Sequence, residues 1–237
     1  IRSERLATYS SHSMTWRALV DIDFWGVNMV SEDSRIFWHC LAFYHGHYRV
    51  EPLYFPLSMD VCMGDSVWQT LRNLYKQQRR WGWGVENLPF IAYNFWRDKS
   101  PEFKLRKKLF YLYIQLEGFH SWATNALIIA VIGWMPMILG GDKFNATVLS
   151  ANLPLVTRWL MTIAMIGMIV SAVISTLLLP PRPSKYGIWK NLQMVLQWTV
   201  LPVNIIIFGA IPGLEAQTRL MLGKYLGFWV TPKIRND

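Results

Sequence analysis

The sequence predicts a fold of the class α/β plus membrane α-helix, in which an α/β portion precedes a set of membrane helices. The chain has 237 residues, is 52% hydrophobic and has a mean hydropathy of +0.18. Its apolar residues crowd into the part after residue 121, whereas residues 1–95 contain only short and mixed apolar runs. This composition is typical of an integral membrane protein with a soluble portion rather than of a water-soluble globule.

Two helices are expected in residues 1–95. Ser31 can cap a helix whose first turn holds Glu32 and Asp33, and acidic side chains are favoured there by the helix dipole. Asp65 or Ser66 can cap a second helix, which runs through VWQTLRNLYKQQRRW.

The rest of the organisation follows from residue type, charge and apolar length. Residues 48–55, closed by Pro56, are rich in β-forming side chains and predict a strand, so residues 1–95 are interpreted as an α/β unit. Residues 96–121 place cationic side chains ahead of aromatic and aliphatic ones and predict a basic interfacial helix. Residues 122–213 hold three segments near the ~20 residues needed to cross a bilayer, and residues 214–237 form a polar, basic tail. The three segments are Trp122 to Leu139, Leu155 to Leu179 and Leu192 to Ile211.

The charge of the chain indicates which classes of partner it binds, and its cysteines indicate whether it has disulfides. The chain has 24 Lys and Arg against 15 Asp and Glu, a net charge of +9, and much of this excess flanks the apolar segments. A lipid bilayer and phosphorylated ligands are therefore favoured as partners over nucleic acid. Cys40 and Cys62, without CxxC spacing, predict reduced thiols and no disulfide framework.

The stretch YKQQRRWGWGVEN, residues 75–87, combines amide, cationic and aromatic side chains. On a helix, Gln77, Arg80 and Trp81 share a face because they stand at positions i, i+3 and i+4. A guanidinium binds phosphate oxygens in a bidentate fork, and an indole offers an apolar plane to a pyranose ring. This face therefore suits a phosphorylated, sugar-bearing ligand; the alternative is a basic amphipathic helix lying at a membrane surface.

Three short motifs occur along the chain in a fixed order: SED at 31–33, QQRRW at 77–81 and FWVTPK at 228–233. This order resembles the second half of the membrane-embedded family 2 glycosyltransferases, the group that includes cellulose, chitin and hyaluronan synthases. The second motif matches Gln-x-x-Arg-Trp at every fixed position, and the first matches Thr-Glu-Asp with Ser31 in place of Thr. The third fits the Phe-x-Val-Thr-x-Lys gating-loop motif of bacterial cellulose synthase.

The resemblance implies an inverting enzyme that moves a sugar from a nucleotide sugar, expected to be a UDP-sugar, to a polysaccharide or lipid-linked acceptor. Residues 1–95 would then be the C-terminal half of a GT-A-type catalytic domain. By resemblance Asp33 is the base that activates the acceptor hydroxyl, with Glu32 beside it in the catalytic motif. The substrate-binding residues implied in the same way are Gln77, Arg80 for the diphosphate, Trp81 for the acceptor sugar, and Thr231 and Lys233 for the nucleotide phosphates.

The resemblance also implies a divalent cation, Mg²⁺ or Mn²⁺, bound upstream of the Glu-Asp motif. Asp21 and Asp23 imitate the family's Asp-x-Asp metal motif, but only seven residues separate Asp23 from Ser31, too few for the intervening strand and helix. Three histidines, at positions 39, 45 and 47, lack a nearby cluster of acids or thiols, so we expect no metal site in this part of the protein. We therefore expect a fragment that lacks its N-terminal part, from an integral protein of the bacterial inner or plasma membrane with its catalytic part in the cytoplasm.

Two alternatives to a polysaccharide synthase remain open: a glycolipid synthase that adds one sugar, and a non-catalytic membrane scaffold or transporter subunit. Topology is open as well, because three full crossings would separate residues 228–233 from residues 1–95, whereas the resemblance requires both on one side. Either one apolar segment is re-entrant or interfacial, or residues 103–121 contribute another crossing.

Overall fold

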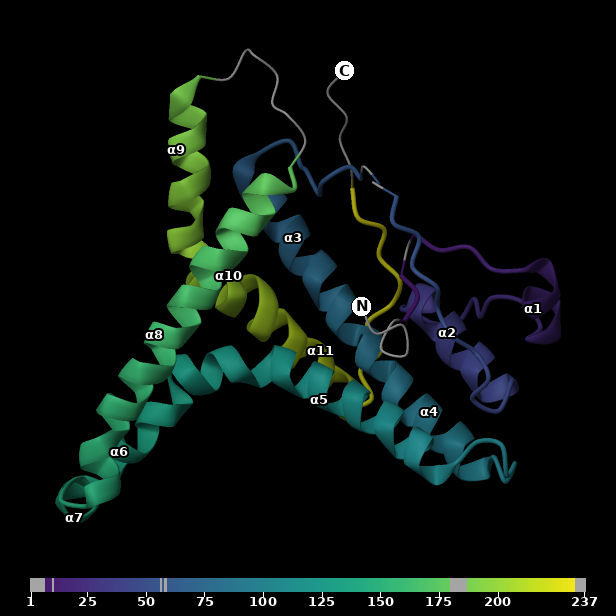
Figure 1. The fold of residues 1–237 in the computed structure, drawn as a ribbon, viewed down its shortest axis with the longest axis horizontal. Coiled ribbons are helices and arrows are strands. Elements are labelled where there is room, and N and C mark those ends of the chain that lie inside the picture. The colour runs from purple at the N-terminus through teal and green to yellow at the C-terminus, as the bar shows by residue number, and fades with distance from the viewer. Residues whose placement is uncertain (1–6, 10, 56, 58, 180–186, 233–237) are drawn as a thin grey trace. The chain divides into compact units, whose positions relative to one another are not determined.

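The computed structural model describes residues 7–9, 11–55, 57, 59–179 and 187–232, apart from the side chains of Ile188 and Asn191. All regular secondary structure in these ranges is helical (Figure 1). The chain divides into two compact units, which we call the first unit, residues 1–125 with 207–237, and the second unit, residues 126–206.

Both helices expected in residues 1–95 are confirmed. Ser66, one of the two predicted caps, is the N-cap of α3: its hydroxyl accepts a hydrogen bond from the backbone N–H of Gln69 at 3.1 Å. Ser31 is the residue before α2, and Glu32 and Asp33 fill its first turn. The helices of the first unit are α1 (Trp16–Asp21), α2 (Glu32–Phe43), α3 (Val67–Gly82), the 3-10 helix η2 (Trp83–Glu86), α4 (Asn87–Arg97), α5 (Leu105–Ala130, as far as residue 125) and α11 (Ile211–Met221).

An aromatic core joins α2, α4 and α5. α2 and α4 present apolar side chains at helical spacing, so that one face of each is buried, and α5 adds a single buried ring. The members of this core that are almost fully buried are Phe37, Trp38 and Leu41 from α2, Ile91 and Phe95 from α4, Phe103, and Tyr111 from α5. The ring pairs Phe37–Trp38 and Phe95–Phe103 meet edge to face at 4.8 Å, the arrangement that aromatic quadrupoles favour.

Small residues bring α3 and α11 into direct contact (Figure 1). A Cβ atom added at Gly82 would lie 3.0 Å from Cα of Gly213 and 3.4 Å from Cβ of Ala216. The end of α3 therefore lies against the backbone of α11. This contact joins the helix that carries the QQRRW motif to the helix that leads into the C-terminal tail.

The predicted strand at residues 48–55 is wrong, and so is the expected C-terminal half of a GT-A-type α/β domain. None of the described residues forms a β-strand. A sequence rich in β-formers makes a strand only where a neighbouring strand pairs with its backbone. No described segment pairs with residues 48–55 in this way, and the side chains of Leu53, Tyr54 and Phe55 are exposed.

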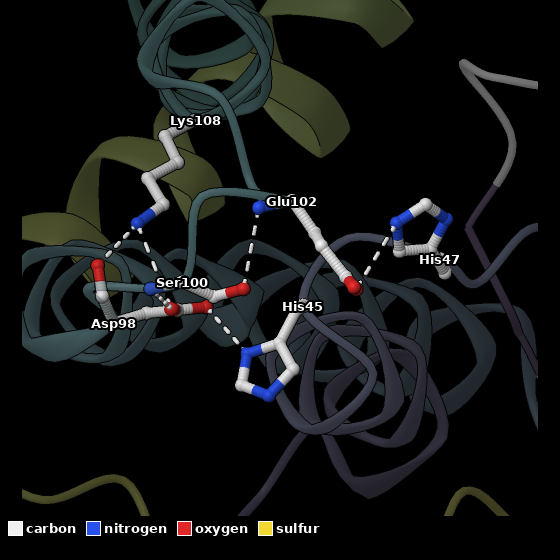
Figure 2. Close-up of polar contacts among 6 residues, drawn as sticks. All are labelled: His45, His47, Asp98, Ser100, Glu102 and Lys108. Carbon is white, nitrogen blue, oxygen red and sulfur yellow. Dashed lines mark hydrogen bonds and ion pairs between the residues drawn. The ribbon is translucent and has the colours of Figure 1, made fainter.

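The turn between α4 and α5 is organised by Asp98 (Figure 2). Its carboxylate lies 3.0 Å from Nδ1 of His45 and accepts the backbone N–H of Ser100 at 2.7 Å. Lys108 donates to the backbone carbonyl of Asp98 at 2.5 Å, and its ammonium is 4.0 Å from the carboxylate. Burial raises the pKa of Asp98, but the hydrogen bonds from His45 and Ser100 and the charge of Lys108 outweigh burial and lower it. The ionised carboxylate explains why a lysine is buried in the first turn of α5.

The predicted basic interfacial helix, residues 96–121, coincides with the end of α4, the turn after it and most of α5. α5 continues without a break to Ala130, so the basic residues and the start of the first apolar segment belong to one helix.

The second unit holds the apolar helices. It contains the end of α5, η3 (Ile132–Trp134), α6 (Met135–Leu139), α7 (Gly141–Asn145), α8 (Val148–Leu177), α9 (Ile188–Leu196), η4 (Gln197–Val200) and α10 (Leu201–Ile205). A π-helical turn, Ile206–Ala210, leads into α11.

Two helical stretches among the described residues are long and apolar enough to cross a membrane, Val148–Leu177 and Leu192–Met221. α5 and the following Ile132–Leu139 would make a third span only if taken together, because they are bent by 47° at the break between them. The membrane character of the chain is thus supported, and two of the three predicted segments overlap these candidate spans. The third predicted segment, residues 122–139, contains the bend.

Candidate functional site

Helix α3 places the three predicted residues Gln77, Arg80 and Trp81 along one side. Gln77 and Arg80 are half-buried, and Trp81 is exposed. The neighbouring Arg79 points elsewhere, since its guanidinium donates to the Glu215 carboxylate of α11 at 2.7 Å. Arg79 therefore lies on a different side of α3 from Gln77, Arg80 and Trp81.

Glu215 of α11 accepts hydrogen bonds from side chains of both α3 and α11. Its carboxylate accepts hydrogen bonds from the hydroxyl of Tyr75 at 2.8 Å and from Arg79 and Arg219 at 2.7 Å each. Since Tyr75 and Arg79 stand at i and i+4 on α3, they mark the side of that helix that faces α11. Arg79 is thereby held in the contact between the two helices.

The C-terminal tail contacts the same helix. The guanidinium carbon of Arg80 lies 5.5 Å from the centre of the Phe228 ring, and Nζ of Lys76 lies 5.3 Å from that of Trp229. These are cation–π distances. Thr231 has a buried hydroxyl without a hydrogen-bond partner among the described residues. The predicted residue Lys233 lies outside the described residues.

The SED motif is fixed by a carboxylate that follows QQRRW. Ser31 does not cap α2 with its side chain; its hydroxyl donates to Oε1 of Glu86 at 2.5 Å. The backbone N–H groups of Val30 and Ser31 donate to the same oxygen at 3.2 and 2.9 Å, and Nε1 of Trp83 donates to the other oxygen at 2.8 Å. Glu86 thus places its negative charge at the start of α2, where the helix dipole favours it.

A second set of hydrogen bonds runs beside the first. Arg35 donates from Nε to the Asn87 side chain at 2.5 Å and from Nη2 to the backbone carbonyl of Glu86 at 3.0 Å. Asn87 in turn donates to the hydroxyl of Ser34 at 2.9 Å, and the Arg35 guanidinium lies 4.1 Å from the centre of the Phe90 ring. Burial lowers the pKa of Arg35, and the charge of Glu86 opposes that shift.

The two predicted catalytic carboxylates have different surroundings. Asp33 is half-buried; its Oδ1 accepts the N–H of Ser34 at 2.8 Å, and its backbone carbonyl accepts the hydroxyl of Thr8 at 2.6 Å. Glu32 has a buried oxygen, Oε2, with no hydrogen-bond partner among the described residues. These contacts hold the backbone of Asp33 in place without removing its carboxylate from solvent.

Sequence reasoning missed Asn73, Glu86 and Glu215. Asn73 had a usable signal, because it precedes Gln77 by four residues and Arg80 by seven and so lies on the same side of α3. Its amide nitrogen is buried and has no hydrogen-bond partner among the described residues. Glu86 and Glu215 each have one partner within a helical turn, Trp83 and Arg219, but their partners in other segments are distant in sequence and gave no local signal.

Three of the residues considered as metal ligands have protein partners instead. Asp21 accepts the hydroxyl of Tyr44 at 2.7 Å. His45 pairs with Asp98, and Nε2 of His47 lies 3.6 Å from a carboxylate oxygen of Glu102. The part of the chain that the structure describes contains no group of three or more side chains suited to hold a metal ion. A divalent cation bound upstream of Ser31 stays a prediction.

Known proteins add nothing to this geometry. No family model, curated protein or solved structure matches the chain. The chemistry of the site therefore rests on the side chains described above and on the three motifs.

The role of Glu86 can be measured. Glu86→Ala should lower the free energy of unfolding of the first unit by about 3 kcal/mol, because the Trp83 N–H and the Ser31 hydroxyl lose their acceptor. Urea unfolding in detergent micelles, followed by tryptophan fluorescence, provides the measurement. Glu51→Ala is the control, since Glu51 forms only an exposed pair with Arg49 and should change stability by less than about 0.5 kcal/mol. Equal stability of the two variants would contradict the role of Glu86.

Proposed function

We propose that this protein is an inverting glycosyltransferase that moves a sugar from a nucleotide sugar, a UDP-sugar, to a polysaccharide or lipid-linked acceptor at the membrane. The observation that carries the proposal is the contact of the C-terminal tail with α3, which joins Phe228 to Arg80. Two motifs that are far apart in the sequence thus meet at the side chain proposed to bind the diphosphate. The bilayer association of the apolar helices is compatible with this function.

Three donors on α3 and on the tail suit a diphosphate. Nε of Arg80, the Asn73 amide nitrogen and the Thr231 hydroxyl are all buried and without hydrogen-bond partners among the described residues. Buried donors are costly unless an acceptor satisfies them, and phosphate oxygens are strong acceptors. With its carbon 5.5 Å from the centre of the Phe228 ring, the guanidinium of Arg80 still has in-plane N–H groups able to donate. A bound diphosphate would satisfy these groups and gain the positive charge of Arg80.

Asp33 is proposed as the base of the reaction, with Glu32 beside it. An inverting transfer needs a carboxylate that takes the proton of the acceptor hydroxyl as the hydroxyl attacks the sugar. The carboxylate of Asp33 is partly open, and its position is tied through Ser31 and Glu86 to the segment that follows Trp81. Gln77 and Trp81 would hold the acceptor sugar next to Arg80.

The packing of the first unit also supports one topology. The tail after Met221 contacts α3 through Phe228 and Trp229, so we infer that this tail and α3 lie on one side of the membrane. Two full crossings, by Val148–Leu177 and by the helix that starts at Leu192, would return the chain to its starting side. The bent pair of α5 and Ile132–Leu139 would then be re-entrant. We propose the cytoplasm as that side, where Lys233 would also reach the nucleotide.

The test is transfer by the full-length protein in lipid nanodiscs. Radiolabelled UDP-glucose, UDP-N-acetylglucosamine and UDP-glucuronate are supplied with Mg²⁺ or Mn²⁺ and lipid extract, and label in lipid and polymer fractions is counted. We expect label in one fraction together with release of UDP. A polysaccharide synthase gives long products, and a single-addition glycolipid synthase gives one labelled lipid. A scaffold or transporter subunit would neither transfer label nor bind UDP, and that result would refute the proposal.

A further inference from the structure

A concave surface lies beside α2. It is a cavity of about 340 Å³ between α2 and residues 22–29. Glu32, Arg35, Ile36 and His39 line it from α2, and their spacing of i, i+3, i+4 and i+7 is that of one helix face. None of the α3 residues assigned above to the diphosphate lines this cavity.

The polar groups of the cavity are mainly acceptors. Oε2 of Glu32 is buried without a hydrogen-bond partner among the described residues, and the carboxylate of Asp23 lies in the opposite wall. Burial and the charge of Arg35 lower the pKa of His39 against the opposing effect of Asp23, so its imidazole is neutral at pH 7. It therefore offers one donor and one acceptor. The guanidinium of Arg35 is already bonded to Asn87 and Glu86.

The wall opposite α2 has an unusual backbone. Asp23 and Phe24 have φ angles of 58° and 64°, a left-handed conformation that residues other than glycine rarely adopt and that is an outlier for an aromatic residue. Such residues cluster at ligand-binding sites. Here they lie in the cavity wall, next to the partly exposed ring of Trp25.

These features select the ligand chemistry. The carboxylates of Asp23 and Glu32 repel an anion, the Arg35 guanidinium disfavours a cation, and a purely apolar ligand would leave Glu32 without a donor. What remains is a neutral molecule with several hydroxyl donors and a flat apolar face for Phe24 or Trp25. The volume is near the lower end of the roughly 300–1,000 Å³ typical of small-molecule sites.

We propose that this cavity binds one neutral pyranose ring, with hydroxyls donating to Glu32 and Asp23 and the ring lying against Trp25. The site is separate from the diphosphate-binding side of α3 and needs no nucleotide. The ring would be a unit of the acceptor, and only that assignment rests on the proposed function.

The test uses the full-length protein in nanodiscs with ¹³C-methyl methionine. Methyl β-D-glucopyranoside and the corresponding N-acetylglucosaminide are titrated in without nucleotide. The methyl resonance of Met29, which lines the cavity, should shift with a Kd in the millimolar range, and that of Met59, which does not, should stay fixed. Glu32→Met and Trp25→Ala should each weaken binding by about tenfold or more. Trp68→Ala, at an exposed tryptophan outside the cavity, is the matched control and should bind as the wild type does.

The outcomes separate this inference from the proposed function. Binding at Met29 without any sugar transfer would support the pyranose site and count against the glycosyltransferase. Transfer activity with no shift at Met29 for either glycoside would overturn the pyranose site alone. Equal binding by Trp25→Ala and Trp68→Ala would also overturn it, as would a shift at Met29 with inorganic phosphate. If Trp25→Ala fails to fold, the shift at Met29 in the wild-type protein decides.

Discussion

Asp33→Asn is expected to lower the rate of sugar transfer by roughly 10²- to 10⁴-fold, the usual cost of removing a positioned base. Affinity for the nucleotide sugar should stay nearly unchanged, because the base acts on the acceptor. The fold should survive as well, since an asparagine oxygen can still accept the Ser34 N–H and the bond from Thr8 goes to the backbone. The turnover number and the Kd for UDP, measured on the same nanodisc preparation, check both parts.

The matched control for this variant is Asp65→Asn. Asp65 is an exposed carboxylate before α3 in the same unit, so its removal changes net charge equally and should leave transfer at the wild-type rate. Turnover of Asp33→Asn above about a tenth of wild type would exclude Asp33 as the base. Loss of UDP affinity in parallel with turnover would instead indicate a damaged site.

Much of the helical fold could be predicted because its signals are local. Ser66 and the acidic residues after Ser31 mark helix starts within one turn of chain, and an apolar stretch such as residues 155–179 is visible in composition alone. The strand expected at residues 48–55 depended on a partner that local sequence does not reveal. Side chains with high β propensity only favour an extended backbone, whereas a strand also requires a second segment to pair with that backbone.

In the candidate site, too, the features set by local spacing could be predicted and those set by distant partners could not. Helical spacing predicted the face that Arg80 shares with Gln77 and Trp81, and the adjacent Arg79 has a different partner from Arg80. The carboxylates that fix the site could not be predicted, because Glu86 binds Ser31 across 55 residues and Glu215 binds Arg79 across 136. Glutamates at such separations look like ordinary surface charges in a sequence. Only the fold identifies them as acceptors for buried donors.

Arg80→Ala is expected to lower kcat/KM for the nucleotide sugar by roughly 10²- to 10³-fold, because it removes the cation that stabilises the departing diphosphate. Arg72→Ala removes an exposed arginine two turns earlier on α3 and should leave kcat/KM near wild type. Both variants lose one positive charge from the same helix. A difference in kcat/KM between the two variants, measured by steady-state kinetics in nanodiscs of fixed anionic lipid content, therefore reports the position of the lost charge and not the change in net charge.

Arg79→Ala completes the series and should differ from both. Arg79 is bonded to Glu215 between α3 and α11, so its loss should first lower thermal stability, and activity should fall only as far as folded protein is lost. Because Arg80 contacts Phe228, Arg80→Ala should also make the tail more sensitive to protease while the rest of the first unit keeps its resistance. Equal losses of kcat/KM in Arg72→Ala and Arg80→Ala would mean that α3 acts through summed charge at an anionic membrane surface. The diphosphate site at Arg80 would then be wrong.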